Sequence, residues 1–357
     1  MPPISVLART RIRLFAPALA VALCSACAAS SAGTGSAPVG STPSAGASGQ
    51  RGAGRLLVAN QQSGNASIID LATGSVKHVD VGTGPHEAII SRDGRLGVVT
   101  VYGAQVPGNQ LALFDMASGT LTRMIDLGEY ARPHDIVFLP GSTSRVAVTS
   151  EASQRVIVVD LTSGTVEAAV ETRANGSHML ALADDGRTLF TTNVPAGSIS
   201  QVDLRSKTFV RHIAVAPVVE GIAITPDGRE VWVGSNQAGT VSIVETATGA
   251  IADTLRGMGM PYRITMSPDG AWAAIPDPEG NRVIVADVRG RRVAGEIAGI
   301  GSPRGVDIAP DNRTAFVTLG PEGEVVVVDL VDRAVLGRHK VGTAPDGVGW
   351  GPSRPMP

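Results

Sequence analysis

The chain has 357 residues, of which 43 are glycine and only 3% are aromatic, and its formal charge is −2. This mildly acidic balance argues against a nucleic-acid backbone as the main partner, because such a partner requires a basic surface. The many glycines at regular spacing are typical of short strands joined by tight turns. Both cysteines, Cys24 and Cys27, lie near the N-terminus, so the body of the chain offers no disulfide and no cysteine-metal site.

Residues 1–27 are predicted to be an export signal. Three arginines precede an apolar run, residues 14–23, that is too short to span a bilayer comfortably. Ser25-Ala26-Cys27 is similar to the site at which a bacterial lipoprotein receives its lipid, whereas Ala26-Cys27-Ala28 is similar to an ordinary A-x-A cleavage site. We expect lipidation of Cys27 and a periplasmic or cell-surface location in a bacterial envelope. Cleavage without lipid would make the protein a secreted one.

Residues 28–54 consist largely of Ser, Gly, Ala and Pro. They lack the apolar content of a core, so we predict a flexible linker. Its position directly after a lipid anchor indicates a tether, and that anchor would be the protein's only attachment to a membrane.

The remaining residues, 55–357, repeat one unit. The phrase LLVANQQSGNASIIDLATG begins at Leu56, and related phrases begin at Leu189 and Val231. In each copy an acidic residue follows fourteen positions after the first residue. Equivalent acidic residues recur at intervals of 42 to 45 along the chain, at Asp70, Asp115, Asp160, Asp203, Glu245, Asp287 and Asp329. This period is typical of four-stranded propeller blades, so we predict an all-β, seven-bladed β-propeller.

One unit is predicted to contain strands at residues 220–225, 230–234, 240–245 and 250–255. The repeated acid precedes a Thr-Gly turn, where it can accept hydrogen bonds from backbone N–H groups, so its role is predicted to be structural. The first blade lacks its first strand. Residues 345–352 resemble the first strand of another blade and are predicted to join the N-terminal blade and close the ring, which removes exposed sheet edges.

The repeated phrases resemble those of YVTN-repeat propellers, the YncE-like family. The resemblance rests on VANQQSGNASIIDLATG, on FTTN at Phe190 to Asn193, on the S/P-x-D-G turns and on the G-x-x-P starts of the blades. It covers about residues 55 to 352. It implies the propeller fold and export, but no particular activity, because many members of the family have no assigned reaction.

The loops that enter the first strands should line one mouth of the central channel. The residue before each of these strands is polar or amphipathic, and in ring order these residues are Asp346, His86, His134, His178, Glu220, Tyr262 and Arg304. The next position adds Glu87, Asp135 and Arg263. The three histidines hold matching places in neighbouring blades, so we predict that they converge on the mouth, opposite Arg263 and Arg304.

Three interpretations of this mouth remain open. The residues could form a site for a small anionic or zwitterionic molecule or a peptide. Neutral imidazoles also ligate divalent metals, which makes His86, His134 and His178 candidate metal ligands, although no cofactor is required. The third interpretation is a hydrated mouth without a ligand.

We expect a monomeric binding or scaffold module that uses the channel-mouth face to hold a protein, peptide or small-molecule partner. The alternative is a hydrolase or lyase of lactone-like molecules, with His178, Glu220 and Arg304 at the mouth, an analogy at the level of the fold. The sequence contains no G-x-S-x-G, H-E-x-x-H or Walker-type motif. Binding is therefore favoured over catalysis.

Overall fold

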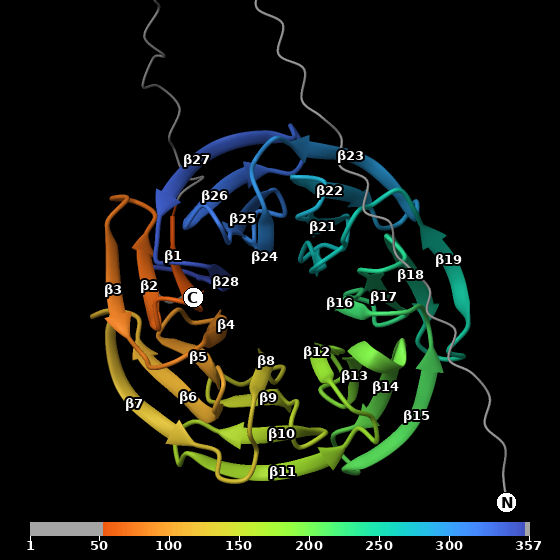
Figure 1. Cartoon of the computed structure of the whole chain (residues 1–357), viewed down its shortest axis with the longest axis horizontal. Coiled ribbons are helices and arrows are strands. Elements are labelled where there is room, and N and C mark those ends of the chain that lie inside the picture. The colour runs from red at the N-terminus through yellow and green to blue at the C-terminus, as the bar shows by residue number, and fades with distance from the viewer. Residues whose placement is uncertain (1–52, 354–357) are drawn as a thin grey trace, which may run out of the picture. The chain divides into compact units, whose positions relative to one another are not determined.

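Seven sheets of four antiparallel strands form a ring in the computed structural model, which describes residues 53–353 (Figure 1). The prediction of a seven-bladed β-propeller is therefore confirmed. In each blade the first strand lies at the central channel and the fourth lies on the outside of the ring. The predicted signal, Cys27 and nearly all of the predicted linker lie outside the described residues. Within residues 53–353, no helix is long and apolar enough to cross a membrane.

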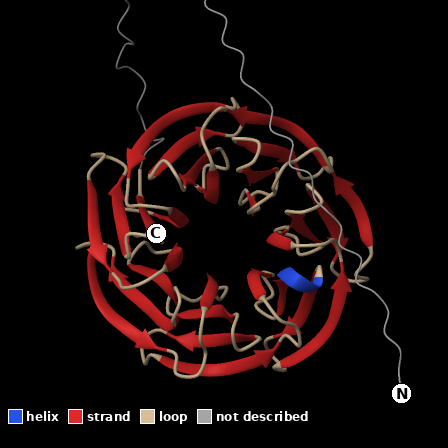
Figure 2. Cartoon of the chain, in the orientation of Figure 1, coloured by secondary structure: helices blue, strands red, loops and turns tan. Residues whose placement is uncertain are grey.

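The strands follow one another from the channel outward in every blade. The first four blades contain β28 (Pro345–Gly351), β1 (Arg55–Asn60), β2 (Asn65–Asp70) and β3 (Val76–Asp80); β4 (Pro85–Ile90), β5 (Leu96–Gly103), β6 (Pro107–Asp115) and β7 (Thr120–Asp126); β8 (Pro133–Phe138), β9 (Arg145–Ser150), β10 (Arg155–Asp160) and β11 (Thr165–Glu171); β12 (Ser177–Leu182), β13 (Thr188–Asn193), β14 (Ser198–Asp203) and β15 (Thr208–Ala214). The last three contain β16 (Val219–Ile224), β17 (Glu230–Ser235), β18 (Thr240–Glu245) and β19 (Ile251–Leu255); β20 (Thr265–Met266), β21 (Trp272–Asp277), β22 (Arg282–Asp287) and β23 (Arg292–Ala298); β24 (Pro303–Ile308), β25 (Thr314–Leu319), β26 (Glu324–Asp329) and β27 (Ala334–Lys340). The helical element of the described part is η1 (Val194–Ala196), a single 3₁₀ turn (Figure 2).

The core of the ring lies between neighbouring blades. The second and third strands are buried on both faces, as in β17 and β18, whereas the fourth strands expose every other side chain or more. Trp232 on β17 is fully buried and packs with apolar residues of the next blade. Full burial of one Val, Leu, Ile, Phe or Met side chain between the blades contributes about 1.5–3 kcal/mol to the free energy of folding.

The repeated acidic residue has the structural role predicted for it. Asp70 accepts hydrogen bonds from the backbone N–H groups of Ala72 and Thr73, both at 3.1 Å. Asp203 and Asp329 accept the equivalent bonds in their own blades. Burial alone would raise the pKa of Asp70, but these hydrogen bonds outweigh it and lower the pKa below its usual value.

The C-terminal strand closes the ring, as predicted. β28 pairs with β1 in an antiparallel register that runs from Arg55↔Gly351 to Asn60↔Pro345. Val348 on β28 packs with Leu56 and Val58 of β1. The first blade is thus assembled from both ends of the described chain, which leaves no open sheet edge at the junction.

Candidate functional site

A β-bulge near the start of the first strand brings the predicted site residues to the channel. The pairing of β4 with β5 jumps from Pro85↔Val101 to Ala88↔Val99, so that His86 and Glu87 together lie opposite Thr100. The same shift occurs in β8, β12, β16 and β24. Such bulges bend a strand and re-aim its side chains, and here they recur at the position of the predicted site.

In the second, third and seventh blades, a buried threonine on the second strand fixes the bulge to the next blade. Thr100 Oγ1 accepts a hydrogen bond from the Glu87 N–H and donates one to the carbonyl oxygen of His134, both at 2.9 Å. Thr149 makes the same pair of bonds, to the N–H of Asp135 at 2.9 Å and the carbonyl of His178 at 2.7 Å. The first strands of blades two, three and four are therefore held at a fixed separation.

The three predicted histidines do converge. The ring centroids of His86 and His134 are 4.0 Å apart, and those of His134 and His178 are 3.6 Å apart. The Tyr102 and His134 rings are perpendicular, with their centroids 5.5 Å apart. His134 is fully buried, and neither of its ring nitrogens has a hydrogen-bond partner among the described residues. Burial and the two neighbouring histidines lower the pKa of His134 well below its usual value, so its imidazole is neutral.

His178, at the end of the stack, is held between two carboxylates. Its Nδ1 lies 3.6 Å from Glu151 Oε2, and its Nε2 lies 3.5 Å from Glu220 Oε1. Burial alone would lower the pKa of His178, but Glu151 and Glu220 raise it to about 9. Burial would likewise raise the pKa of Glu220, but the hydrogen bond from His178 and the charge of Arg263 lower it to about 2. The His178–Glu220 contact is therefore an ion pair at neutral pH.

Arg263 joins the acidic side chains of three blades. Its guanidinium lies 2.7 Å from Glu87 Oε1, 3.0 Å from Glu220 Oε1 and 3.7 Å from Asp346 Oδ1. Burial would raise the pKa of Glu87, but the Arg263 charge outweighs it and lowers the pKa of this carboxyl. Arg263 is only 5% exposed, so it serves these carboxylates and does not offer a free guanidinium to an anionic ligand.

Tyr262 and Arg304, two further predicted residues, lie beside Arg263. The Arg263 guanidinium stacks over the Tyr262 ring at 4.4 Å, and Arg304 Nη1 lies 3.4 Å from the Tyr262 hydroxyl. The structure thus brings nine of the ten predicted mouth residues into one connected cluster, and the tenth, Asp135, lines the cavity described below. We call the following set the polar layer: His86, Glu87, His134, His178, Glu220, Arg263 and Asp346.

Three residues that support this layer were missed by the sequence analysis. Glu151 and Asn236 directly follow the second strands β9 and β17, and Tyr102 lies near the end of β5. Tyr102 donates a hydrogen bond to Glu151 at 2.7 Å, and Asn236 donates one to Glu220 at 2.5 Å. Their common place at the end of the second strand, near the mouth, is the signal that could have identified them.

A cavity of about 440 Å³ lies within the channel. It extends from the polar layer toward the C-terminal ends of the first strands. Glu87 and Arg263 of the polar layer line it at one end, and Arg92, Phe138 and Trp350 line it at the other. Its walls are mainly aliphatic, with Ile136, Leu180, Ile222, Ile264, Val306 and Val348 among the lining residues. This cavity was not predicted, because the sequence pattern marks only the loops at the mouth.

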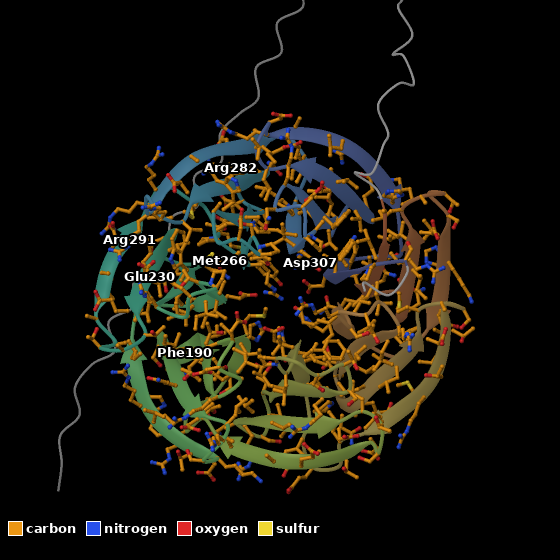
Figure 3. All side chains as sticks on the ribbon, turned by 180° about the vertical axis from the view of Figure 1, so that it is seen from behind. Phe190, Glu230, Met266, Arg282, Arg291 and Asp307 are labelled. Atoms are coloured by element: carbon orange, nitrogen blue, oxygen red, sulfur yellow. The ribbon has the colours of Figure 1, made fainter. Side chains whose placement is uncertain are left out.

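Two aspartates face this cavity from opposite sides of the ring, Asp135 in the third blade and Asp307 in the seventh. Figure 3 shows Asp307 at the inner edge of the ring. Asp307 accepts hydrogen bonds from the N–H groups of Ile308 and Trp350, at 2.8 and 2.7 Å. Burial raises the pKa of Asp307 to about 6, and burial together with the Glu87 charge raises the pKa of Asp135 to about 7. Neither aspartate forms an ion pair with a cation of residues 53–353.

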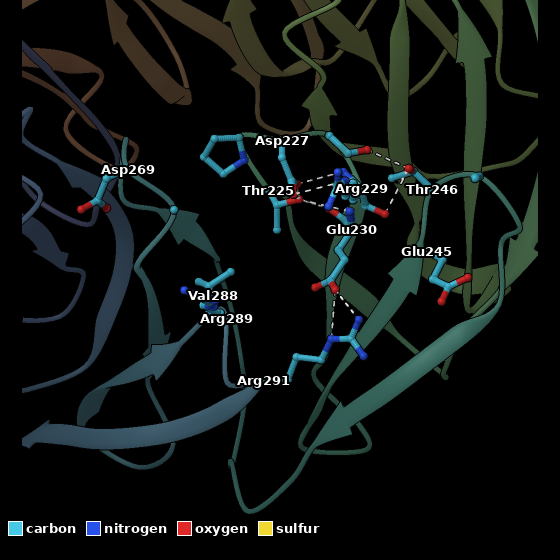
Figure 4. A pocket seen from close by; sticks show the side chains of 14 residues that line it. Thr225, Asp227, Arg229, Glu230, Glu245, Thr246, Asp269, Val288, Arg289 and Arg291 are labelled. Carbon is cyan, nitrogen blue, oxygen red and sulfur yellow. Dashed lines mark hydrogen bonds and ion pairs between the residues drawn. The ribbon is translucent and has the colours of Figure 1, made fainter.

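A larger recess lies away from the channel, between the fifth and sixth blades (Figure 4). Its volume is about 820 Å³, and Thr225, Asp227, Glu230 and Arg291 are among the residues that line it. These side chains already bond to one another: Arg291 Nε donates to Glu230 at 2.9 Å, and Thr225 donates to Asp227 at 2.6 Å. Because Glu230 and Arg291 are paired with each other, as are Asp227 and Arg229, the recess is a weaker candidate site than the channel.

Comparison with known proteins agrees with the fold. Residues 180–353 match the family model of YNCE-like beta-propellers, which confirms the resemblance predicted from the sequence. A solved structure titled Kuenenia stuttgartiensis Hydrazine Synthase is similar, with a TM-score of 0.66 and 17% identity over 85% of this chain and 99% of that chain. At this identity the likeness shows the fold alone. None of the curated proteins matches the sequence.

Proposed function

We propose that the protein is a binding module whose central channel holds a small, largely apolar molecule that carries a positive charge. One observation carries the proposal: an aliphatic cavity of about 440 Å³ contains two carboxyl groups, Asp135 and Asp307, that have no cationic partner among the described residues. Small-molecule sites in proteins are typically cavities of this size with apolar walls and a few convergent polar groups.

The charges around the cavity favour a cation. Glu87, Asp135 and Asp307 line it. Of its two arginines, Arg263 is already offset by three carboxylates, and Arg92 is exposed at the far end. A bound anion would meet two buried carboxyl groups, whereas an ammonium group would offset the cost of keeping them ionised in an apolar site. Phe138 and Trp350 add aromatic surface, which attracts cations as well as apolar groups.

A matched ligand series tests this proposal. Calorimetric titration with benzylamine, benzyl alcohol and benzoate compares a cation, a neutral molecule and an anion of similar shape. We expect saturable binding of benzylamine at one site per chain, with at least tenfold weaker binding of the other two. Asp307→Asn should weaken benzylamine binding, because it removes the charge and keeps the size of the side chain.

Asp253→Asn is the matched control. Asp253 also accepts a hydrogen bond from the next backbone N–H, at 2.7 Å to Thr254, but it lies on the outer strand β19. Equal loss of binding in both variants, or a preference for benzoate, would contradict the proposal. The absence of binding for all three ligands would contradict it as well.

The hydrolase alternative has one observation in its favour, the contact of His178 with Glu220 at the channel. A general base that works near neutral pH needs a pKa near 7, however, and the pKa of His178 is raised to about 9 while that of Glu220 is lowered to about 2. The pair is thus suited to hold its neighbours in place. Turnover of a panel of sugar lactones by the wild type, and its loss in His178→Ala, would favour the hydrolase over the binding module.

A further inference from the structure

The histidine stack holds polar atoms that the described residues leave unsatisfied. His134 is fully buried between His86 and His178, and both of its ring nitrogens lack a hydrogen-bond partner within residues 53–353. A buried polar group without a partner costs about 1–3 kcal/mol. Such a cost is offset when an atom from outside the chain binds the free nitrogen.

Two further donor groups lie next to this imidazole. One ligand atom each from His86, Glu87 and His134 lies within 4.8 Å of the others. Donor atoms on one tetrahedral ion are roughly 3.3 Å apart when the metal–nitrogen distance is about 2.0–2.1 Å. Small side-chain rotations would therefore bring the three groups onto one ion.

We propose that His86, His134 and Glu87 form a binding site for one divalent transition-metal ion such as Zn²⁺. Two imidazoles and a carboxylate are a donor set that Zn²⁺, Co²⁺ and Ni²⁺ accept in proteins, with a fourth position open to water or a ligand. The site adjoins the cavity of the proposed function but rests on a different observation.

The surroundings of the three groups fit this role. His86 Nε2 lies 3.6 Å from Asp346 Oδ2, a placement that orients the ring and directs Nδ1 toward Glu87. Metal-binding histidines commonly use their second nitrogen in this way. The contacts of Glu87 with His86 and Arg263 both use Oε1, so Oε2 remains for the ion. Gly347 allows the Glu87 carboxylate to lie in this position, because a Cβ on residue 347 would lie 2.5 Å from Glu87 Oε2.

The structure favours Glu87 over His178 as the third ligand. Both ring nitrogens of His178 face carboxylates, those of Glu151 and Glu220, and the residue stands at the far end of the stack from His86. The metal set predicted from the sequence, His86, His134 and His178, is thus changed in one member. Substitution of Glu87 therefore tests this ligand set specifically.

Calorimetric titration of the metal-free protein, without an affinity tag, with Zn²⁺ alone tests the site. We expect one ion per chain in the wild type and at least tenfold weaker binding in His134→Ala and in Glu87→Gln. His339→Ala is the control, because His339 lies on the outer strand β27. Binding that survives in His134→Ala, or that falls equally in His339→Ala, would overturn the proposal, as would no stoichiometric uptake.

A second measurement does not depend on the folding of a variant. NMR of the histidine rings in the wild type should show that Zn²⁺ shifts the signals of His86 and His134, with smaller changes for His178 and none for His339. Shifts confined to His78, His212 or His339 would overturn the proposal. Because benzylamine binding is measured separately, failure of the metal site leaves the proposed function intact, and failure of benzylamine binding leaves the metal site intact.

Discussion

At the scale of single residues, the most consequential side chains are the threonines that join neighbouring blades. Thr318 Oγ1 accepts a hydrogen bond from the Gly305 N–H at 2.8 Å and donates one to the Asp346 carbonyl at 2.7 Å. Thr318→Val keeps the shape but leaves both buried backbone groups without this partner. We expect a loss of about 1–3 kcal/mol in the free energy of unfolding, measured by urea denaturation.

Thr191→Val provides the comparison for that variant. Thr191 is equally buried, but its hydroxyl makes only one long bond, 3.3 Å to the adjacent Thr192 carbonyl. The loss should therefore be clearly smaller than in Thr318→Val. Equal losses would mean that the interblade hydrogen bonds contribute little.

Asp307 should make the stability of the protein depend on pH. Burial raises its pKa from 3.8 to about 6, so the folded state binds a proton more tightly than the unfolded state. Folding is then favoured at low pH, and this contribution is lost as pH rises from about 4 to 6, by at most about 3 kcal/mol. The other charged groups that share the cavity are Glu87, Arg92, Asp135 and Arg263.

Asp307→Asn removes this titration. The free energy of unfolding of the variant, relative to the wild type, should rise between pH 4 and pH 6 and then stay constant to pH 7. Urea denaturation at several pH values measures the difference. A constant difference across this range would show that Asp307 does not titrate with a raised pKa.

The sequence allowed some of these residues to be predicted and not others. His86, His134 and His178 could be predicted to meet because they hold the same position in consecutive repeats. The partners of these histidines could not be predicted. The contact of Arg263 with Glu87 joins residues 176 positions apart, and it depends on the bulge in β4 and on the irregular segment before β20. Asp307 was missed because it lies three positions after the mouth residue Arg304, on a part of the first strand that lines the cavity.

At the scale of elements, β28 determines whether the ring is closed. It pairs with β1 on one side. On its other side Gly347 allows the backbone of β4 to come close, because a Cβ on residue 347 would lie 2.5 Å from the Glu87 Cα. Deletion of residues 344–357 removes this strand and exposes Leu56 and Val58. We expect a lower melting temperature and a tendency to aggregate through the open edge.

A chain that ends at Ser353 is the control, because it retains β28. Thermal unfolding followed by circular dichroism compares the two truncations with the full chain. If the deletion of 344–357 melts at the same temperature as the control, the closing strand does not stabilise the ring.

Strand positions were predictable from the repeat wherever its chemistry was retained. The sixth blade departs from it: β20 comprises only Thr265–Met266, whereas the other first strands have six or seven residues. Pro276 on β21 stands where the second, third, fourth and seventh blades have a threonine, and it has neither a hydroxyl nor an N–H to donate. Tyr262 and Arg263 therefore lie in an irregular segment, a deviation that the acidic spacing alone does not reveal.

At the scale of the whole molecule, we propose that the propeller is held at a bacterial envelope by lipid on Cys27. The Ser25-Ala26-Cys27 step and the Ser/Gly/Ala/Pro-rich residues 28–54 support this proposal. Mass spectrometry of the mature N-terminus should find a diacylated or triacylated Cys27. An unmodified N-terminus at Ala29 would contradict lipidation and indicate secretion.

The central claim is that the channel, and not the recess between the fifth and sixth blades, is the ligand site. A crystal structure of the wild type with 4-bromobenzylamine tests it most directly, because the anomalous signal of bromine locates the ligand. The account predicts one strong bromine peak in the channel cavity, with the ammonium group next to Asp307 or Asp135. Bromine peaks only in the recess near Glu230 and Arg291, with an empty channel, would contradict it.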